Sequence, residues 1–307
     1  MNIKDAQSKG EFKRQEDAFR NWVTVDGSSL YASEKDRYHL YVSLACPWAH
    51  RTLIVRTLMG LDHVVGATVV DPVRDDRGWR FGTGDGFTED PINGFHFLQE
   101  AYHISDPNWH GRVTVPVLWD KKTRQIVNNS EDDICLMFHK AFVSFSNHKW
   151  DLFPQNVADE QAELSNLIYE KVNNGVYRAG FAGAQAVYER AVRGVFETLD
   201  MLENRLADRR YLFGDFITEA DLRLFCTLIR FDAVYYVHFK CNMRRIVDYP
   251  HLWGYLRDLY QVEGIAETVN LDHIKRHYYI THPDINPTRF VPVGPVDLGF
   301  DAPHGRG

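Results

Sequence analysis

The sequence has few cysteines and no long apolar run. Its 307 residues include only four cysteines, which lie far apart and form neither a Cys-x-x-Cys pair nor a Cys/His cluster: Cys46, Cys135, Cys226 and Cys241. This spacing argues against a disulfide framework and against a zinc site. No apolar run approaches the roughly 18 residues of a membrane span, and the first twenty residues lack the apolar core of a signal peptide. We therefore expect a cytoplasmic protein without a metal and without membrane attachment.

The chain also lacks a strong excess of charge of either sign. The 35 basic and 42 acidic side chains give a net charge of −7, and no run of Lys or Arg occurs. A mild acidic balance of this kind argues against nucleic acid as a partner. The length and the 44% hydrophobic content fit a globular protein with two domains.

The first half of the chain predicts a β-α-β unit followed by a β-β-α unit. An arm over residues 1–37 precedes a domain over residues 38–145, and a Gly/Asp-rich excursion over 71–112 has the composition of a surface loop. Hydrophobic periodicity places the strands and helices of this domain at 38–44, 47–59, 64–70, 113–119, 125–127 and 130–139.

The second half is predicted to be helical over residues 155–280. The 3.6-residue period indicates helices at 158–173, 183–205, 219–235, 250–261 and 271–276. Thr218 and Asp221 have the spacing of a capping box at the third of these helices. The Pro/Gly-rich tail over 281–307 is expected to be extended and to pack down through Phe290, Val291 and Val293.

Cys46 stands between an apolar strand and a helix that begins with Pro47. Proline is tolerated in a first helical turn because its missing N–H has no partner there, so Cys46 falls at or next to the N-cap. Backbone N–H groups and the helix dipole favour a thiolate at such a position, where the pKa of a cysteine can lie well below about 8.5. A buried small hydrophobe is the alternative. The strand, the Cys-Pro pair and the helix together favour a nucleophile.

An α/β domain of this order with a cysteine at its first helix, followed by an all-helical domain, resembles the glutathione transferases. Four segments make the resemblance specific: Ser43–Ala49, Arg112–Asp120, Asn173–Phe181 and Asp272–Tyr279. In order and over about residues 38–295, they resemble the glutathionyl-hydroquinone reductases, also called Xi-class glutathione transferases. The resemblance implies a thioredoxin-like N-terminal domain, an all-α C-terminal domain, and a homodimer joined through the helical domain.

The resemblance also implies an activity. Cys46 would attack the sulfur of a glutathionyl-hydroquinone, release the hydroquinone and form a mixed disulfide, which a second glutathione resolves. Motif matching gives Tyr177 and Tyr278 as the catalytic phenols that donate a proton to the substrate, with Tyr279 and Tyr169 as further substrate-binding residues. The chain has 15 tyrosines, and ordinary helix packing is the alternative for most of them.

The thiol site is likewise carried over from the family. Val115–Pro116 resembles the cis-proline corner whose preceding residue offers its backbone N–H and C=O to the cysteinyl part of the ligand. Trp79 and Arg112 resemble the tryptophan and arginine set around the glycyl end and the thiol, where a guanidinium suits a carboxylate. The alternative is that both side chains are surface groups of a loop.

One segment departs from the family pattern. The family usually has Glu then Ser at the helix start that binds the γ-glutamyl group, whereas this chain has Ser130 then Glu131. Asp132 and Asp133 add negative charge to a pocket expected to accept an anion. Either the helix start is shifted by one residue, or the co-substrate is another low-molecular-weight thiol that lacks the γ-glutamyl group.

Two other functions stay open at this stage. An omega-type thiol transferase or dehydroascorbate reductase would use the same cysteine without a tyrosine cluster. A non-catalytic relative of the same fold would bind a partner through residues 71–112 or through the tail. His50, one turn after Cys46, is expected at an interface or in solvent rather than as a base for the thiol.

Overall fold

The computed structural model describes residues 7–306 except 9 and 147–149. Within these, the chain divides into two compact units. The sheet unit comprises Gln15–Trp150 and Glu267–His277, and the helical unit comprises the described residues before Gln15 together with Asp151–Ala266 and the chain from Tyr278 onward. Helix α9, Leu271–Thr281, contributes residues to both units.

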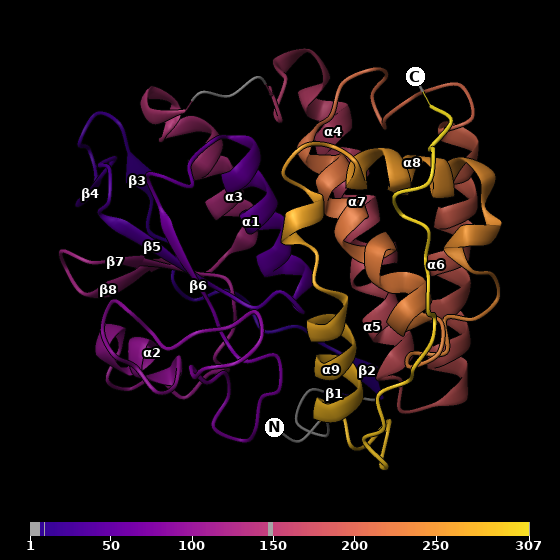
Figure 1. Ribbon diagram of the computed structural model, residues 1–307, viewed down its shortest axis with the longest axis horizontal. Helices are drawn as coiled ribbons and strands as arrows, with labels where there is room; N and C mark the ends of the chain where they lie inside the picture. The colour runs from indigo at the N-terminus through magenta and orange to yellow at the C-terminus, as the bar shows by residue number, and fades with distance from the viewer. Residues whose placement is uncertain (1–6, 9, 147–149, 307) are drawn as a thin grey trace. The chain divides into compact units, whose positions relative to one another are not determined.

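The sheet unit is built on a four-stranded mixed sheet of order β6-β5-β7-β8 (Figure 1). Its strands are β5 (Tyr38–Val42), β6 (Gly66–Val69), β7 (Val117–Asp120) and β8 (Gln125–Asn128). β5 runs parallel to β6 and antiparallel to β7, and β7 runs antiparallel to β8. Every residue of β5 is buried, as the central position of this strand requires. The predicted β-α-β, β-β-α order is confirmed.

The helices of this unit are α1 (Pro47–Leu58), α2 (Gln99–Ser105) and α3 (Glu131–Lys140), with a 3₁₀ turn at Val143–Phe145. α1 and α3 pack against each other, and Figure 1 shows both on the opposite side of the sheet from α2. Two short pairs of strands lie outside the main sheet: β1 (Gln7–Ser8) with β2 (Glu11–Phe12) in the helical unit, and β3 (Val23–Thr24) with β4 (Tyr31–Ala32) in the sheet unit.

Two expectations for this unit need correction. The segment 71–112 is not only surface loop, because it contains α2 and buries Trp79, Phe81 and Phe95. Its glycines and aspartates make turns, while the aromatic side chains between them pack inward. The strand expected from Val113 begins only at Val117, since Pro116 has no N–H to give to a ladder.

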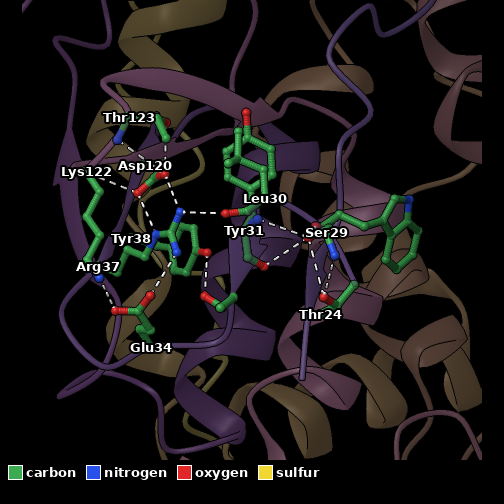
Figure 2. Close-up of polar contacts among 12 residues, drawn as sticks. Thr24, Ser29, Leu30, Tyr31, Glu34, Arg37, Tyr38, Asp120, Lys122 and Thr123 are labelled. Atoms are coloured by element: carbon green, nitrogen blue, oxygen red, sulfur yellow. Dashed lines mark hydrogen bonds and ion pairs between the residues drawn. The ribbon is translucent and has the colours of Figure 1, made fainter. Parts of the chain in front are cut away.

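A buried ion pair ties the start of β5 to the end of β7 (Figure 2). Arg37 donates from Nε and Nη2 to the two carboxylate oxygens of Asp120, at 2.9 and 2.8 Å. Arg37 also donates to Glu34 and to the Leu30 carbonyl, and Asp120 accepts from the backbone N–H of Lys122. Every charge in this network therefore has a partner, as burial demands.

The helical unit contains α4 (Ala158–Ile168), α5 (Gly175–Gly180), α6 (Gln185–Arg205), α7 (Glu219–Arg230) and α8 (Pro250–Tyr260). Shorter 3₁₀ turns lie at Gln155–Val157, Ile246–Asp248 and Ala266–Thr268. The predicted helices over 158–173 and 219–235 are each correct in extent but finish as π-helical turns, at Tyr169–Asn173 and Phe231–Tyr235. α5 was not predicted, and α9 is five residues longer than the expected 271–276.

The predicted capping box at the start of α7 is confirmed. The backbone N–H of Thr218 donates to Oδ2 of Asp221 at 2.8 Å, and the side chain of Thr218 takes part in the reciprocal bond. Asp221 is fully buried and also accepts from the Leu212 N–H and the Tyr255 hydroxyl, at 2.9 and 3.0 Å. Asp221 therefore joins the start of α7 to the loop before it and to α8.

The described part of the tail beyond Thr281 has no regular helix or strand and packs down, as expected, but not through Phe290 and Val293. Phe290 and Val293 are 77% and 86% exposed. The tail packs instead through Phe300, whose ring lies 5.7 Å from Trp253 and 5.1 Å from Tyr260, and through Arg306. Among the described residues, no helix combines the length and the apolarity needed to cross a bilayer.

Candidate active site

Cys46 is the N-cap residue of α1, as predicted, and Pro47 is the first residue of the helix. Its carbonyl accepts the first helical hydrogen bond, from the His50 N–H at 2.9 Å. The thiol lies 3.6 Å from the carbonyl oxygen of Val115. Cys46 is partly exposed, whereas the other three cysteines are buried, and burial raises the pKa of Cys241 to about 12. Cys46 is thus the cysteine that a dissolved molecule can reach.

His50 lies at a packed contact. It is 1% exposed, and its Nε2 is 2.7 Å from the hydroxyl of Thr268. Of the two expected positions, an interface or solvent, the burial of His50 is inconsistent with solvent.

The peptide bond between Val115 and Pro116 is cis, as the sequence predicts. Two hydrogen bonds hold the backbone of the residues that precede this peptide bond. The Tyr102 hydroxyl donates to the Thr114 carbonyl at 2.9 Å, and the Arg112 N–H donates to Gln15 Oε1 at 2.8 Å. These bonds fix the backbone that faces the Cys46 thiol.

Trp79 is not a surface group of a loop. It is only 4% exposed, and its backbone carbonyl accepts from the Leu98 N–H at 2.9 Å. Its ring stacks on the imidazole of His277, and the guanidinium carbon of Arg74 lies 5.3 Å from its ring centroid. Arg112, by contrast, is partly exposed.

Helix α3 begins at the segment that departs from the family pattern. Ser130 is the N-cap and Glu131 the first helical residue of α3, so the carboxylate stands inside the first turn. The Ser130 side chain makes no capping bond to the helix, and its N–H donates to Asn128 Oδ1 at 2.7 Å.

The acidic side chains of this turn are held by arginines from elsewhere in the sheet unit. Arg51 of α1 pairs with Glu131 at 3.3 Å and with Asp132 at 2.5 Å. Asp133 accepts from Arg20 Nη2 at 2.8 Å. Burial, reinforced by the neighbouring Asp132 carboxylate, raises the pKa of Glu131 to about 7 even though Arg51 opposes this. Three carboxylates therefore share two guanidinium groups at the start of α3.

In the helical unit, three tyrosines meet at their hydroxyl groups. The Tyr278 hydroxyl is hydrogen-bonded to that of Tyr177 and, at 2.9 Å, to that of Tyr235. Tyr177 is 9% exposed and the other two are essentially buried. Burial raises the pKa values of Tyr235 and Tyr278 well above 10, so both hydroxyls stay protonated at neutral pH. The cluster is thus a chain of hydroxyl donors.

The sequence analysis missed Tyr235. It lies in the π-helical turn after α7, where helical periodicity gives no signal that a residue changes face. The other two candidate tyrosines, Tyr279 and Tyr169, lie in the same unit. Tyr279 donates to the Ala233 carbonyl at 3.2 Å, and Tyr169 is partly exposed with the guanidinium carbon of Arg223 5.9 Å from its ring centroid.

Within the described residues, no group of three or more His, Cys, Asp or Glu side chains is placed to hold a metal ion.

Comparison with known proteins agrees with this architecture. Residues 45–141 match the profile of the glutathione S-transferase N-terminal domain, and residues 185–258 match that of the C-terminal domain. These matches define a glutathione transferase.

The most similar relatives place the chain within one class. It is 50% identical to the glutathionyl-hydroquinone reductase YqjG of Escherichia coli over 97% of this chain and 92% of that protein. PcpF of Sphingobium chlorophenolicum, also a glutathionyl-hydroquinone reductase, is 45% identical over 94% of this chain and 91% of PcpF.

Solved structures place the chain in the same class. The Xi-class transferase of Natrialba magadii has a TM-score of 0.92 at 51% identity, covering 94% of this chain and 88% of that one. The glutathione-bound structure of YqjG has a TM-score of 0.91 at 50% identity, covering 94% and 96%. The chain belongs to the Xi-class glutathione transferases, the family of the glutathionyl-hydroquinone reductases.

Proposed function

We propose that this protein is a thiol-dependent reductase that converts glutathionyl-hydroquinones to hydroquinones through Cys46. The observation that carries the proposal is the partly exposed thiol of Cys46 at the N-terminus of α1, beside the carbonyl of Val115, in a chain half identical to a glutathionyl-hydroquinone reductase. The first turn of a helix stabilises a thiolate, and the thiolate is the attacking species in exchange reactions.

The reaction has two steps. The Cys46 thiolate attacks the substrate sulfur, the bond between sulfur and the ring carbon breaks, and that carbon takes the electron pair and a proton. A mixed disulfide between Cys46 and the thiol remains. A second thiol molecule attacks it, which releases the oxidised disulfide, restores Cys46 and returns the proton. The sum is one hydroquinone adduct and one thiol converted to hydroquinone and disulfide.

The proposed proton donors are Tyr177 and Tyr278. General acid catalysis needs a protonated group, and the raised pKa of Tyr278 keeps its hydroxyl protonated. The bonds among Tyr177, Tyr278 and Tyr235 support a shared donor network, since a proton given up by one hydroxyl is replaced from its neighbour.

Glutathione is the thiol that we propose first, because a relative at 50% identity has been solved with glutathione bound. The pairing of Glu131 and Asp132 with Arg51 leaves another low-molecular-weight thiol as the second candidate. Comparing kcat/KM for glutathione with that for thiols lacking a γ-glutamyl group separates the two. Equal or better efficiency with glutathione removes the second candidate.

The tyrosines distinguish this function from that of an omega-type thiol transferase. We expect Tyr177→Phe and Tyr278→Phe each to lower kcat on a glutathionyl-hydroquinone by about 10²-fold, the usual scale of general acid catalysis. Turnover of a small mixed disulfide, which needs no proton at carbon, should change less than twofold. Tyr188→Phe is a matched control, since the Tyr188 hydroxyl donates to the Lys240 carbonyl at 2.7 Å. Equal losses on both substrates would contradict the tyrosine assignment.

Two further expectations remain proposals. A homodimer joined through the helical domain is tested by light scattering of the purified protein at micromolar concentration. A cytoplasmic location, where a reduced thiol pool supplies the second step, is tested by fractionation.

A further inference from the structure

Two histidines of α9 are hydrogen-bonded to the segment 71–112, and the proposed reaction assigns no role to either of them. His273 and His277 are four residues apart and therefore lie on one face of the helix. His273 Nε2 is 2.6 Å from the Asp85 carbonyl oxygen, and His277 Nδ1 is 2.7 Å from the Pro72 carbonyl oxygen. A carbonyl oxygen only accepts, so each of these ring nitrogens carries the proton.

His277 differs from His273 in what its ring touches. The imidazole of His277 stacks on the indole of Trp79 with 5.1 Å between centroids and 20° between planes. His273 meets Phe87 edge-on at 6.0 Å. The bond to Pro72 ties one edge of the His277 ring to the segment 71–112, and the face of the ring lies against the indole of Trp79.

The contact between Trp79 and His277 is buried. Trp79 is 4% exposed, and His277 is 8% exposed, so water cannot replace the contact. The Leu98 N–H bonds the backbone of Trp79, and the guanidinium carbon of Arg74 lies 5.3 Å from its ring centroid, whereas His277 is the ring stacked parallel to the indole.

We propose that His277 is a positioning residue for thiol binding, because it holds the indole of Trp79 in the orientation that the ligand meets. The inference rests on the proposed function and on the family resemblance, which implies that Trp79 belongs to the thiol site. His277 itself need not touch the ligand.

Two substitutions separate its contacts. His277→Phe keeps a ring for Trp79 but has no donor for Pro72, and His277→Asn keeps a donor near the Nδ1 position but has no ring. We expect His277→Asn to weaken glutathione binding about fivefold, the factor that corresponds to about 1 kcal/mol for a lost ring pair. We expect His277→Phe to stay within about twofold of the parent.

The test measures glutathione affinity by calorimetry in the full-length Cys46→Ser protein, where no exchange chemistry occurs. A double-mutant cycle adds Trp79→Leu. If His277 acts through Trp79, His277→Asn has no further effect once the indole is gone. His273→Gln is the matched control, because it retains a donor at the Nε2 position on the same helix face and should leave affinity unchanged.

Three outcomes would overturn the proposal: additive effects of His277→Asn and Trp79→Leu, equal losses from His277→Phe and His277→Asn, or an equal loss from His273→Gln. In turnover, the positioning role predicts a higher KM for the thiol with kcat within about twofold. A protein that lacks reductase activity but whose glutathione affinity still shows the coupling would refute the proposed function alone. Absent glutathione binding in the parent would refute the positioning role, whereas turnover with another thiol would still support the reductase function.

Discussion

Breaking the buried pair of Arg37 and Asp120 should destabilise the sheet unit more than any surface pair can. The two side chains are 6% and 0% exposed and meet through two parallel hydrogen bonds. Asp120→Asn would remove the buried counter-charge of the Arg37 guanidinium and leave it the partly exposed carboxylate of Glu34. The expected loss is about 3–5 kcal/mol in the free energy of unfolding.

The assay is urea unfolding followed by tryptophan fluorescence, since the fully buried Trp119 precedes Asp120 in β7. With a slope of about 3 kcal/mol per molar urea, the midpoint should fall by about 1 M or more. Asp75→Asn is the matched control, because Asp75 pairs with Arg77 through similar bonds but both are largely exposed. Its midpoint should not move measurably.

The same pair predicts a pH dependence. Burial alone would raise the pKa of Asp120, but the bond from Arg37 and the donors at Lys122 and Thr123 outweigh it and hold the pKa below the usual value. Since the folded state lowers this pKa, the stabilisation is present above about pH 4 and is lost as the pH falls through the folded-state pKa. Adding Arg37→Met to Asp120→Asn should restore part of the loss. Equal midpoints for Asp120→Asn and Asp75→Asn would refute the reasoning.

Three further predictions concern other parts of the structure. Burial lowers the pKa of His39 to about 4, below the roughly 6.5 of an unfolded chain, so the free energy of unfolding should fall as the pH is lowered from 6.5 to 4. His39→Gln should reduce this pH dependence in urea unfolding, and an unchanged pH dependence would contradict the prediction. Asp221→Ala should cost about 3 kcal/mol in urea unfolding by removing a helix cap and leaving buried donors without an acceptor. Arg306→Ala removes donors to four backbone carbonyls and should cost about 1–3 kcal/mol in thermal unfolding; an unaltered midpoint would mean that the tail does not stabilise the helical unit.

Most elements of the fold could be predicted from patterns among neighbouring residues. The N-cap position of Cys46 follows from a strand, a Cys-Pro pair and a helix within twenty residues, and the capping box of α7 spans only Thr218 to Asp221. Periodicity found the long helices but not α5, which at six residues is too short to show a period.

Contacts between residues far apart in the chain could not be predicted from the sequence pattern. The acidic turn at Glu131 could be read as negative charge, but its partner Arg51 lies about 80 positions earlier and does not follow from spacing. Composition marked 71–112 as a loop because turn residues dominate it, although Trp79 packs in the interior. A π-helical turn adds one residue to a helix without changing its composition, which is why Tyr235 escaped notice.

Turnover of a chemically prepared glutathionyl-hydroquinone with added glutathione, measured for the parent protein beside Cys46→Ala, tests the central claim most directly. We expect the parent to release hydroquinone and oxidised glutathione in equal amounts, and Cys46→Ala to release neither above the uncatalysed rate. Release by both proteins, or by neither, would contradict the assignment of Cys46 as the nucleophile of a glutathionyl-hydroquinone reductase.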